Sequence, residues 1–249
     1  MLCLISSDRP QFLFPAVYSL PMKDIKVKQR DSSVFLNSYS GFLFDMDGTL
    51  VNSIPVVERI WLEWAAEHGL DGQALLQQVH GIRVVDVVKM LNMPHLDPDA
   101  IAAAFLAEEM QDFAGIRAIA GAKDFLASLP ADRWTIVTSA PRELAEARLA
   151  AAGLPVPETI VVAEDVSAGK PDPSGYRLGA QRLGFDAADC LVFEDAPAGI
   201  AAGEAADAQV VVISETHSHP VKGGSVEFRD FSRLGMMQDS DGRLRLSVG

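Results

Sequence analysis

Residues 42–50 read Phe-Leu-Phe-Asp-Met-Asp-Gly-Thr-Leu, a short apolar run that ends in two carboxylates, Asp45 and Asp47. An apolar run of this length, with glycine just beyond it, predicts a buried strand that leaves its sheet into a loop. In open α/β sheets, ligands bind at the carboxyl ends of the strands. Two acids released there could hold a hard cation, and one of them could attack an electrophile. The simpler alternative is a strand that ends in solvated aspartates.

The composition is that of an ordinary globular protein, with 49% hydrophobic and 22% charged residues among 249. This length allows one large domain or a domain with a smaller insertion. The net charge of -13 argues against nucleic acid as a partner, because phosphate backbones attract basic faces. It does not exclude a small anionic substrate, since a metal ion and a few cations can reverse the field inside one cleft.

The cysteines, Cys3 and Cys190, are far apart and lack metal-ligand spacing, so we expect no disulfide framework and a cytoplasmic location. The longest apolar stretches fall well short of the ~20 residues of a membrane helix, so we expect no membrane association. The start of the chain is a poor signal peptide. Residues 1–38 show no clear periodicity, and we interpret them as an N-terminal extension, either partly disordered or translated from upstream sequence.

From residue 39 onward, strand-like and helix-like segments alternate. Strands are predicted at 41–45, 134–138, 159–162, 190–193 and 209–213. Helices are predicted at 122–129, 141–152, 173–183 and 198–206. This alternation predicts an α/β fold, a Rossmann-like parallel sheet with helices on both faces. Segments 226–228 and 243–248 are expected to pair with each other as edge strands.

One block of the chain contains only helical patterns, at 54–68, 71–79, 84–91 and 97–113. The last of these starts well, because Asp97 can cap it and Pro98 suits its first turn. We therefore expect residues 39–54 and 119–249 to form the core and residues 55–118 to form a small α-helical cap inserted after the first strand. The expected hinges are 50–55 and 114–120.

Polar groups follow the later strands as well. Thr138 and Ser139 end one strand, where a hydroxyl and backbone amides suit a phosphate, although Ser139 also stands where a helix cap belongs. Lys170 lies between glycine and proline, which favours a fixed position over a solvated surface lysine. Glu194 and Asp195 follow another buried strand. Together with the first two acids, these groups form the set that phosphoryl transfer uses.

In this order, the motifs Asp-Met-Asp-Gly-Thr, Thr-Ser, Gly-Lys-Pro and Glu-Asp resemble the four-motif pattern of the haloacid dehalogenase-like phosphohydrolases. The resemblance covers roughly residues 40–215, and the helical block is similar to that family's small helical cap. Several shorter segments look like the sugar-phosphate phosphatases of the superfamily, at 50–53, 80–83, 137–139 and 193–199. Neighbours in that branch hydrolyse hexose, pentose, hexitol or glycerol phosphates. Asn52 departs from the pattern, which usually has Asp there, but this position does not carry the chemistry.

The resemblance implies a phosphoric monoester hydrolase that works through an aspartyl-phosphate intermediate. Asp45 would be the nucleophile, and Asp47 would protonate the leaving alcohol and then activate water. The implied cofactor is Mg2+, bridging Asp45, the Asp47 carbonyl, Asp195 and the phosphate, with Glu194 as a ligand or acting through a metal-bound water. Four residues would neutralise phosphoryl charge: Thr138, Ser139, Ala140 and Lys170.

Substrate choice would lie in the cap. Arg83 and Asp86 are spaced i, i+3 and could face the cleft together, offering donors and acceptors to sugar hydroxyls. The alternative is a surface ion pair on a cap helix. The expected partner is a small phosphorylated sugar or polyol, and the expected assembly is a monomer or a weak homodimer.

Three other functions compete with hydrolysis. A phosphosugar mutase of the β-phosphoglucomutase type shares the core and the double Asp, but such mutases carry a His where this chain has Val57 and tend to have Val at the place of Thr49. A haloacid dehalogenase would need neither Asp47 nor a metal. A phospho-accepting signalling or binding domain also gathers acids, Thr/Ser and Lys, but receiver domains are shorter and lack a cap.

Overall fold

A seven-stranded sheet with the order β1-β9-β8-β7-β2-β5-β6 forms the centre of the protein. The computed structural model describes residues 26–27, 32–217 and 221–249. The strands of the sheet are β1 (Lys26–Val27), β2 (Gly41–Phe44), β5 (Trp134–Val137), β6 (Ile160–Val161), β7 (Cys190–Glu194), β8 (Gln209–Ile213) and β9 (Val226–Phe228). All pairs from β9 to β6 are parallel, and β1 adds to β9 antiparallel. The Rossmann-like α/β fold predicted from the sequence is confirmed.

The strand that carries the opening motif lies in the middle of the sheet. β2 is fully buried, with β5 on one side and β7 on the other. Its last residue, Phe44, pairs in register with a residue of each neighbour. Because the three strands are parallel, the residues that follow them emerge at one edge of the sheet.

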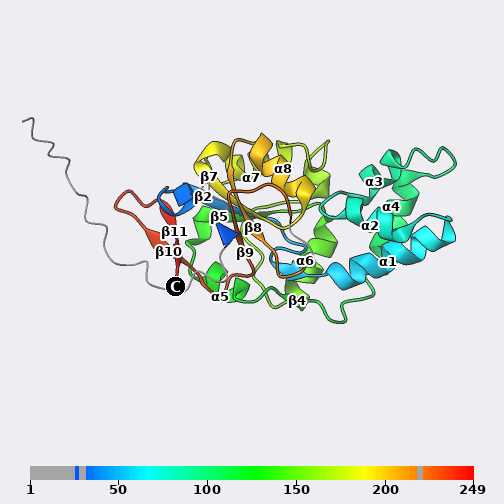
Figure 1. Cartoon of the computed structure of the whole chain (residues 1–249), viewed down its shortest axis with the longest axis horizontal. Helices are drawn as coiled ribbons and strands as arrows, with labels where there is room; N and C mark the ends of the chain where they lie inside the picture. Colours follow the sequence, from blue (N-terminus) through cyan, green and yellow to red (C-terminus); the bar gives the residue numbers. More distant parts are fainter. Residues whose placement is uncertain (1–25, 28–31, 218–220) are drawn as a thin grey trace, which may run out of the picture.

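Helices cover both faces of this sheet (Figure 1). α5 (Ala122–Ala127) and α6 (Arg142–Ala151) lie on one face, and α7 (Ser174–Arg182) and α8 (Pro197–Ala205) on the other. The side chains of β2 alternate between the two layers: Phe42 and Phe44 join the first hydrophobic cluster and Leu43 the second. Single 3₁₀ turns occur at η3 (Ala131–Arg133), η4 (Ala163–Asp165) and η5 (Ala187–Asp189). Among the described residues, the helices do not combine the length and the hydropathy that a membrane-spanning helix needs.

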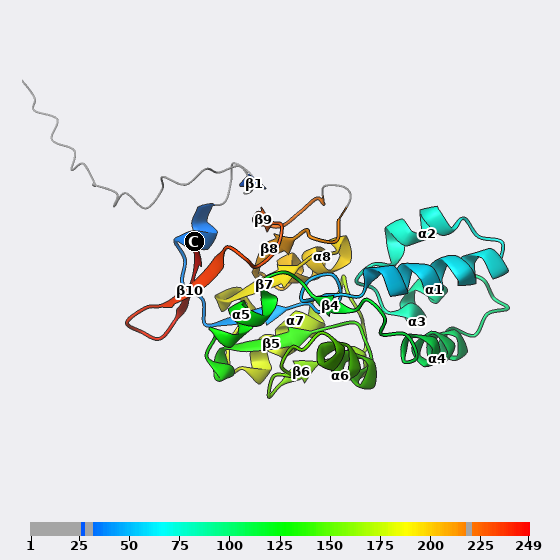
Figure 2. The ribbon, with the colours of Figure 1, turned by 90° about the horizontal axis from the view of Figure 1, so that it is seen from below.

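Four helices lie at one end of the core, and we call them the helical insert (Figure 2). They are α1 (Ile54–Glu67), α2 (Gly72–Val79), α3 (Val84–Met90) and α4 (Pro98–Glu109). Each occurs where a helix is predicted, although α4 ends at Glu109 rather than at 113. It starts as expected, since Asp97 accepts hydrogen bonds from the amides of Asp99 and Ala100. The rings of Trp61 and Phe105 pack together inside the insert, with centroids 4.5 Å apart.

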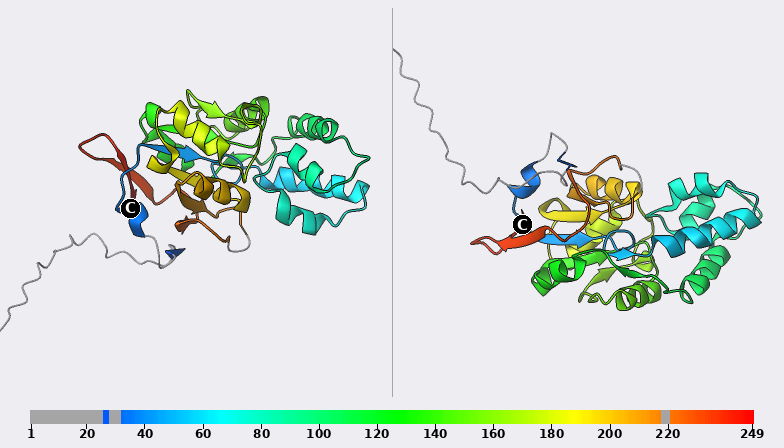
Figure 3. Two further views of the ribbon diagram at one scale, coloured as in Figure 1. Left: turned by 90° about the horizontal axis from the view of Figure 1, so that it is seen from above. Right: turned by 60° about the horizontal axis from the view of Figure 1, so that its bottom comes forward.

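The two connections between insert and core pair with each other. β3 (Val51–Asn52) and β4 (Arg117–Ala118) form a two-stranded antiparallel ladder. Both lie within the segments expected to act as hinges. The insert stands clear of the sheet in both further views, joined to the core through this region (Figure 3).

Part of the predicted N-terminal extension belongs to the core. Residues 1–25 and 28–31 lie outside the described residues. However, β1 pairs with β9, and the 3₁₀ helix η2 (Ser32–Phe35) buries Val34 completely. Tyr39 then exchanges backbone hydrogen bonds with Leu244. The boundary at residue 38 therefore does not separate a free extension from the fold.

The expected pairing of 226–228 with 243–248 is wrong. β9 instead continues the main sheet beside β8, and β11 (Leu244–Val248) pairs with β10 (Leu234–Gln238) in a separate hairpin. The Leu-Gly-Met-Met-Gln sequence of β10 lacks the β-branched residues that mark a strand, so its pattern gave no signal. A nearby hairpin partner closes a shorter loop than β9 would, which favours the observed pairing.

Candidate active site

The candidate site lies where the three central strands of the sheet end. Asp45 follows β2, Thr138 follows β5, and β7 ends in Glu194 with Asp195 next to it. Lys170 reaches the same edge from the loop before α7. The structure thus brings together the polar side chains that the sequence pattern assigned to separate strand ends.

Lys170 joins two of these acids. Its Nζ donates to Asp45 Oδ1 at 2.5 Å and to Glu194 Oε1 at 2.7 Å, and all three side chains are buried. Burial by itself would lower the pKa of Lys170, but the charges of Asp45 and Glu194 outweigh burial, so its pKa is raised and it stays charged. Burial raises the pKa of Asp45 well above its ordinary value, and the charge of Glu194 raises it further.

Glu194 accepts hydrogen bonds at both carboxylate oxygens. Oε1 accepts from the Tyr176 hydroxyl at 2.9 Å as well as from Lys170. Oε2 accepts from the amides of Asp195 and Ala196 at 2.8 and 3.0 Å. A carboxylate has about four lone-pair sites. These contacts therefore favour a role for Glu194 in fixing Lys170 over direct metal ligation.

Asp195 is buried against the loop that follows β2. Its Oδ1 accepts from the Thr49 hydroxyl at 3.2 Å, and its Oδ2 lies 3.3 Å from His217 Nε2. Gly48 makes this approach possible, because its φ is +94° and a Cβ there would lie 2.1 Å from Asp195 Oδ2. Burial raises the pKa of Asp195.

Asp45, Glu194 and Asp195 form a buried acid cluster, with ligand oxygens within 4.8 Å of one another. When all are ionised, three carboxylates and the one ammonium of Lys170 leave an excess of two negative charges. A divalent cation would neutralise this excess, and carboxylate oxygens are ligands that Mg2+ prefers. Asp45 and Asp195 of this cluster therefore fit the Mg2+ that the sequence resemblance implies, while Glu194 contributes its charge and holds Lys170.

Asp47 belongs to a second polar group. Its Oδ1 accepts from the Ser53 hydroxyl at 2.5 Å and from Arg148 Nη1 at 3.0 Å. Arg148 Nη2 donates to Glu109 Oε1, on α4 of the helical insert, at 2.9 Å. Burial raises the pKa of Glu109. A single guanidinium thus joins a carboxylate of the insert to a carboxylate of the core.

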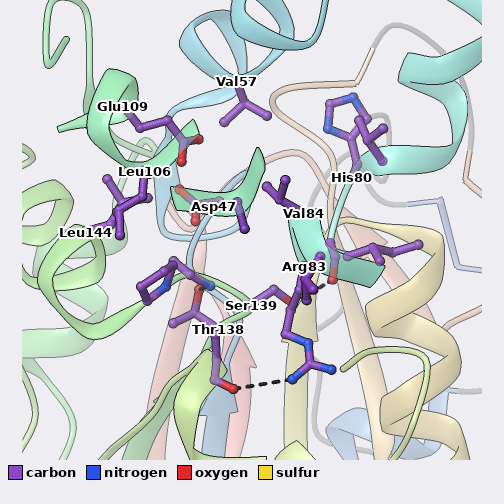
Figure 4. A pocket seen from close by; sticks show the side chains of 18 of the residues that line it. Asp47, Val57, His80, Arg83, Val84, Leu106, Glu109, Thr138, Ser139 and Leu144 are labelled. Atoms are coloured by element: carbon purple, nitrogen blue, oxygen red, sulfur yellow. Dashed lines mark hydrogen bonds between the residues drawn. The ribbon is translucent and has the colours of Figure 1, made fainter. Parts of the chain in front are cut away.

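A cavity of about 370 Å³ lies between the helical insert and the core. Figure 4 shows Val57 and His80 of the insert facing Asp47 and Thr138 of the core across it. Asp45 and Arg148 also line this cavity. Its volume is that of a site for a small molecule, and its acids lie at the sheet edge.

Thr138 and Ser139 make different contacts. Thr138 Oγ1 accepts from the Ala140 amide at 3.0 Å, and Ser139 Oγ donates to the carbonyl of Gly81 in the insert at 2.8 Å. The residue at the N-cap of α6 is Pro141, and the amide of Arg142 in the first turn donates to Glu164 rather than to Ser139. The interpretation of Ser139 as a simple helix cap is therefore wrong, since its hydroxyl connects the core to the insert.

Arg83 connects the insert to the core at a second place. Its Nε donates to Asp86 Oδ2 at 2.6 Å, and its Nη atoms donate to the carbonyls of Val166 and Ser167 at 2.9 and 3.1 Å. Arg83 lines the cavity, whereas Asp86 is not among the described residues that line it. The pair is not simply a surface ion pair, because Arg83 also holds a loop of the core.

A sequence model of the haloacid dehalogenase-like hydrolases matches residues 39–207. The chain belongs to the haloacid dehalogenase-like hydrolase family. It is similar to hexitol phosphatase A of Escherichia coli, with 41% identity over an alignment that covers 72% of this chain and 85% of that protein. It is also similar to glycerol-1-phosphate phosphohydrolase 2 of Saccharomyces cerevisiae, with 30% identity over 70% of this chain and 74% of that protein. A solved hydrolase of this family from Deinococcus radiodurans, with bound phosphate and sodium, is 31% identical with a TM-score of 0.53 over 74% of this chain and 85% of that one.

Arg148 and Glu109 of this hydrolase were not predicted from the sequence. One signal was present for Arg148: it shares the buried face of α6 with Leu144, Ala145 and Leu149, and a charge among apolar positions of a helix needs a partner. Glu109 gave no such signal, because it ends an acidic and alanine-rich helix. His80 also lines the cavity, where it pairs with Glu58 at 3.3 Å.

The arrangement in this hydrolase suits attack by a carboxylate. Asp45 lies at the end of the central strand, with the ammonium of Lys170 on one side of its carboxylate. Asp47 lines the same cavity and is partly exposed, with 22% of its side chain accessible. One buried and one accessible carboxyl at i, i+2 can divide the work of nucleophile and proton carrier.

Proposed function

We propose that the protein is a phosphatase that hydrolyses monoesters of small sugars or polyols through an aspartyl-phosphate. The observation that carries the proposal is the geometry of Asp45: a buried carboxylate at the end of the central strand, bound to Lys170 and open to the cavity it shares with Asp47. The similarity to a hexitol phosphatase and a glycerol-1-phosphate phosphohydrolase supports the substrate class.

In the first step, a carboxylate oxygen of Asp45 attacks phosphorus and forms an acyl phosphate. The bond between phosphorus and the ester oxygen breaks, and its electron pair stays on that oxygen. Protonated Asp47 gives its proton to the same oxygen, so the sugar or polyol leaves as a neutral alcohol. This split of one slow displacement into two steps suits phosphate monoesters, which hydrolyse extremely slowly without a catalyst.

In the second step, water attacks the phosphorus of the acyl phosphate. Asp47, now a carboxylate, takes a proton from that water, and the bond from phosphorus to the Asp45 oxygen breaks. Inorganic phosphate leaves, Asp45 is a carboxylate again, and Asp47 again carries its proton. Ser53 and Arg148 hold Asp47 in both steps.

The proposed Mg2+ would be held by the carboxylates of Asp45 and Asp195 and by the backbone carbonyl of Asp47. When bound, it would neutralise negative charge on the phosphoryl group and on the acid cluster. The contacts of Glu194 support a part in holding Lys170 rather than a direct bond to the metal.

The proposed phosphate contacts come from the core. They are the Thr138 hydroxyl, the amides at Ser139 and Ala140, and the ammonium of Lys170. We propose that the helical insert is the cap that closes over the loaded phosphate and excludes water. Arg83 and Asp86, proposed as substrate contacts, act at least partly by holding the insert against the core.

The charges in the cavity favour a monophosphate over a bisphosphate. Its basic side chains are already paired among the described residues: Arg83 with Asp86 and backbone carbonyls, Arg148 with Asp47 and Glu109, and His80 with Glu58. A second phosphate would have to break one of these pairs. This weighs against the phosphosugar mutase, which must accommodate a bisphosphate.

Phosphate release from a panel of hexitol, glycerol, hexose and pentose phosphates tests the proposal, in Mg2+ and in EDTA. Asp45→Asn should lower kcat by about a thousandfold or more without lowering the melting temperature. Asp124→Asn, an exposed aspartate on α5, is the matched control. Near-normal kcat in Asp45→Asn would rule out the nucleophile. Turnover of a hexose 1-phosphate only with added bisphosphate would favour the mutase.

A further inference from the structure

Arg148 is a buried arginine in a position where an apolar side chain would pack. It lies on α6 with only 3% of its surface exposed, on the face that carries Leu144 and Leu149. Burying a guanidinium costs several kcal/mol unless its donors are well paired. Its contacts are therefore expected to serve more than packing.

The contacts of Arg148 join three parts of the fold. Nη1 binds Asp47 Oδ1 at 3.0 Å, in the loop after β2, and Nη2 binds Glu109 Oε1 at 2.9 Å, at the end of α4 in the helical insert. Arg148 itself belongs to α6 of the core. Any movement of the insert away from the core takes Glu109 from this guanidinium.

The two donors to Asp47 meet at one oxygen. Ser53 and Arg148 both donate to Oδ1, and Oδ2 has no donor among the described residues. Two donors at Oδ1 leave Oδ2 as the oxygen at which a proton can be given or taken. The geometry therefore orients Asp47 with a definite oxygen, Oδ2, available for proton transfer.

We propose that Arg148 is a positioning residue, which holds Asp47 by Oδ1 so that Oδ2 carries the transferred proton, and which is itself held by Glu109 when the insert is closed. This inference rests on the proposed function, because it assigns Asp47 the proton transfer. Closure of the insert then completes the orientation of the acid, so that the proton is presented when the substrate is enclosed.

Comparison of two leaving groups tests this positioning role. Sorbitol 6-phosphate must receive a proton as its alcohol leaves, whereas p-nitrophenolate leaves without one. The ratio kcat/KM covers the steps up to departure of the leaving group. Arg148→Met should therefore lower kcat/KM by about 100-fold or more for sorbitol 6-phosphate, but by less than about tenfold for p-nitrophenyl phosphate. A purely structural role would lower both equally.

Two further variants keep the test valid if Arg148→Met folds poorly. Arg148→Lys keeps the positive charge but reaches only one of the two carboxylates. Glu109→Gln removes the negative charge that the insert places beside Arg148. Each variant should lower kcat/KM for sorbitol 6-phosphate by about tenfold. Arg148→Met combined with Glu109→Gln should be no worse than Arg148→Met alone. Arg142→Met, an exposed arginine on the same helix, should stay within about twofold of the wild type.

Hydrogen exchange gives a readout that does not need activity. Arg148→Met and Glu109→Gln should both raise the rate of amide hydrogen exchange in two segments of the insert that face the core, 79–84 and 105–113. Arg142→Met should leave these rates unchanged. Unchanged exchange, or equal losses on the two substrates, would overturn the inference. A wild-type protein that hydrolyses neither ester would instead overturn the proposed function and with it the role of Arg148 in proton transfer. Raised hydrogen exchange in the Arg148 and Glu109 variants would still support the contact between Arg148 and Glu109.

Discussion

The carboxylate of Glu194 occupies the space where a side chain at position 199 would lie, and Gly199 keeps that space open. A Cβ at position 199 would lie 1.5 Å from Glu194 Oε1 and 2.6 Å from Oε2. The side chain of Glu194 thus crosses the first turn of α8, where only glycine fits. From there it accepts from Lys170, Tyr176 and the amides at the helix start.

Gly199→Ala is expected to displace Glu194 and, through it, Lys170. We expect kcat for a polyol phosphate to fall by about 100-fold and the unfolding free energy to fall by about 2 to 4 kcal/mol, because buried charges lose partners. Gly203→Ala on the same helix is the matched control, since its Cβ would meet Val210 Cγ2 at 2.8 Å and leave Glu194 in place. It should destabilise but keep kcat. Equal kcat in the two variants would contradict this account.

Lys170→Met should strongly destabilise the protein. It leaves the buried carboxylates of Asp45 and Glu194 without their common cation, which costs about 3 to 5 kcal/mol by comparison with other broken buried pairs. Urea denaturation measures this, with the exposed Lys123→Met as control. If Lys170→Met and Lys123→Met unfold at the same urea concentration, the ion pairs of Lys170 with Asp45 and Glu194 contribute little to the free energy of unfolding.

The contribution of Asp45 and Asp195 to the stability of the metal-free protein should fall as pH rises. The folded-state pKa values of Asp45 and Asp195 lie above 3.8, so the folded protein holds these protons more tightly than the unfolded chain. Their contribution is fully present below pH 3.8 and is lost as pH rises through the raised values.

Mg2+ should therefore stabilise the protein more at neutral than at acid pH. The gain at neutral pH should be about 3 kcal/mol at about 100 times the Kd. Melting temperatures in Mg2+ and in EDTA, measured across pH, check this, and Asp45→Asn should flatten the EDTA curve. A difference between Mg2+ and EDTA that does not change with pH would refute the linkage.

Arg83→Met is expected to raise KM about five- to tenfold with little change in kcat. The reason is that the insert loses its bonds to Val166 and Ser167, so a smaller fraction of the protein is closed before substrate binds. Asp86→Asn should raise KM about threefold for the same reason. An effect of Arg83→Met without any effect of Asp86→Asn would indicate direct contact with substrate instead. Lys89→Met, exposed on the same helix, should change neither constant.

Much of the site follows from local sequence. The buried run before Asp45, and the similar run before Glu194, predict parallel strands, and parallel strands bring their carboxyl ends to one edge whatever their order in the sheet. The pairing of 226–228 could not be predicted in the same way. Short strands carry little pattern, and the partner is chosen by which sheet edge is free when the chain returns.

Local periodicity, and the places where strands stop, are enough to predict the α/β core, the helical insert and the acids, hydroxyl and lysine at the strand ends. Which of these groups share a hydrogen bond depends instead on how the elements pack. The bond between Arg148 and Glu109 joins residues 39 positions apart, on helices whose relative placement no local pattern encodes. The opening pair of acids is thereby divided: Asp45 lies with Lys170, and Asp47 lies with the arginine that contacts the insert.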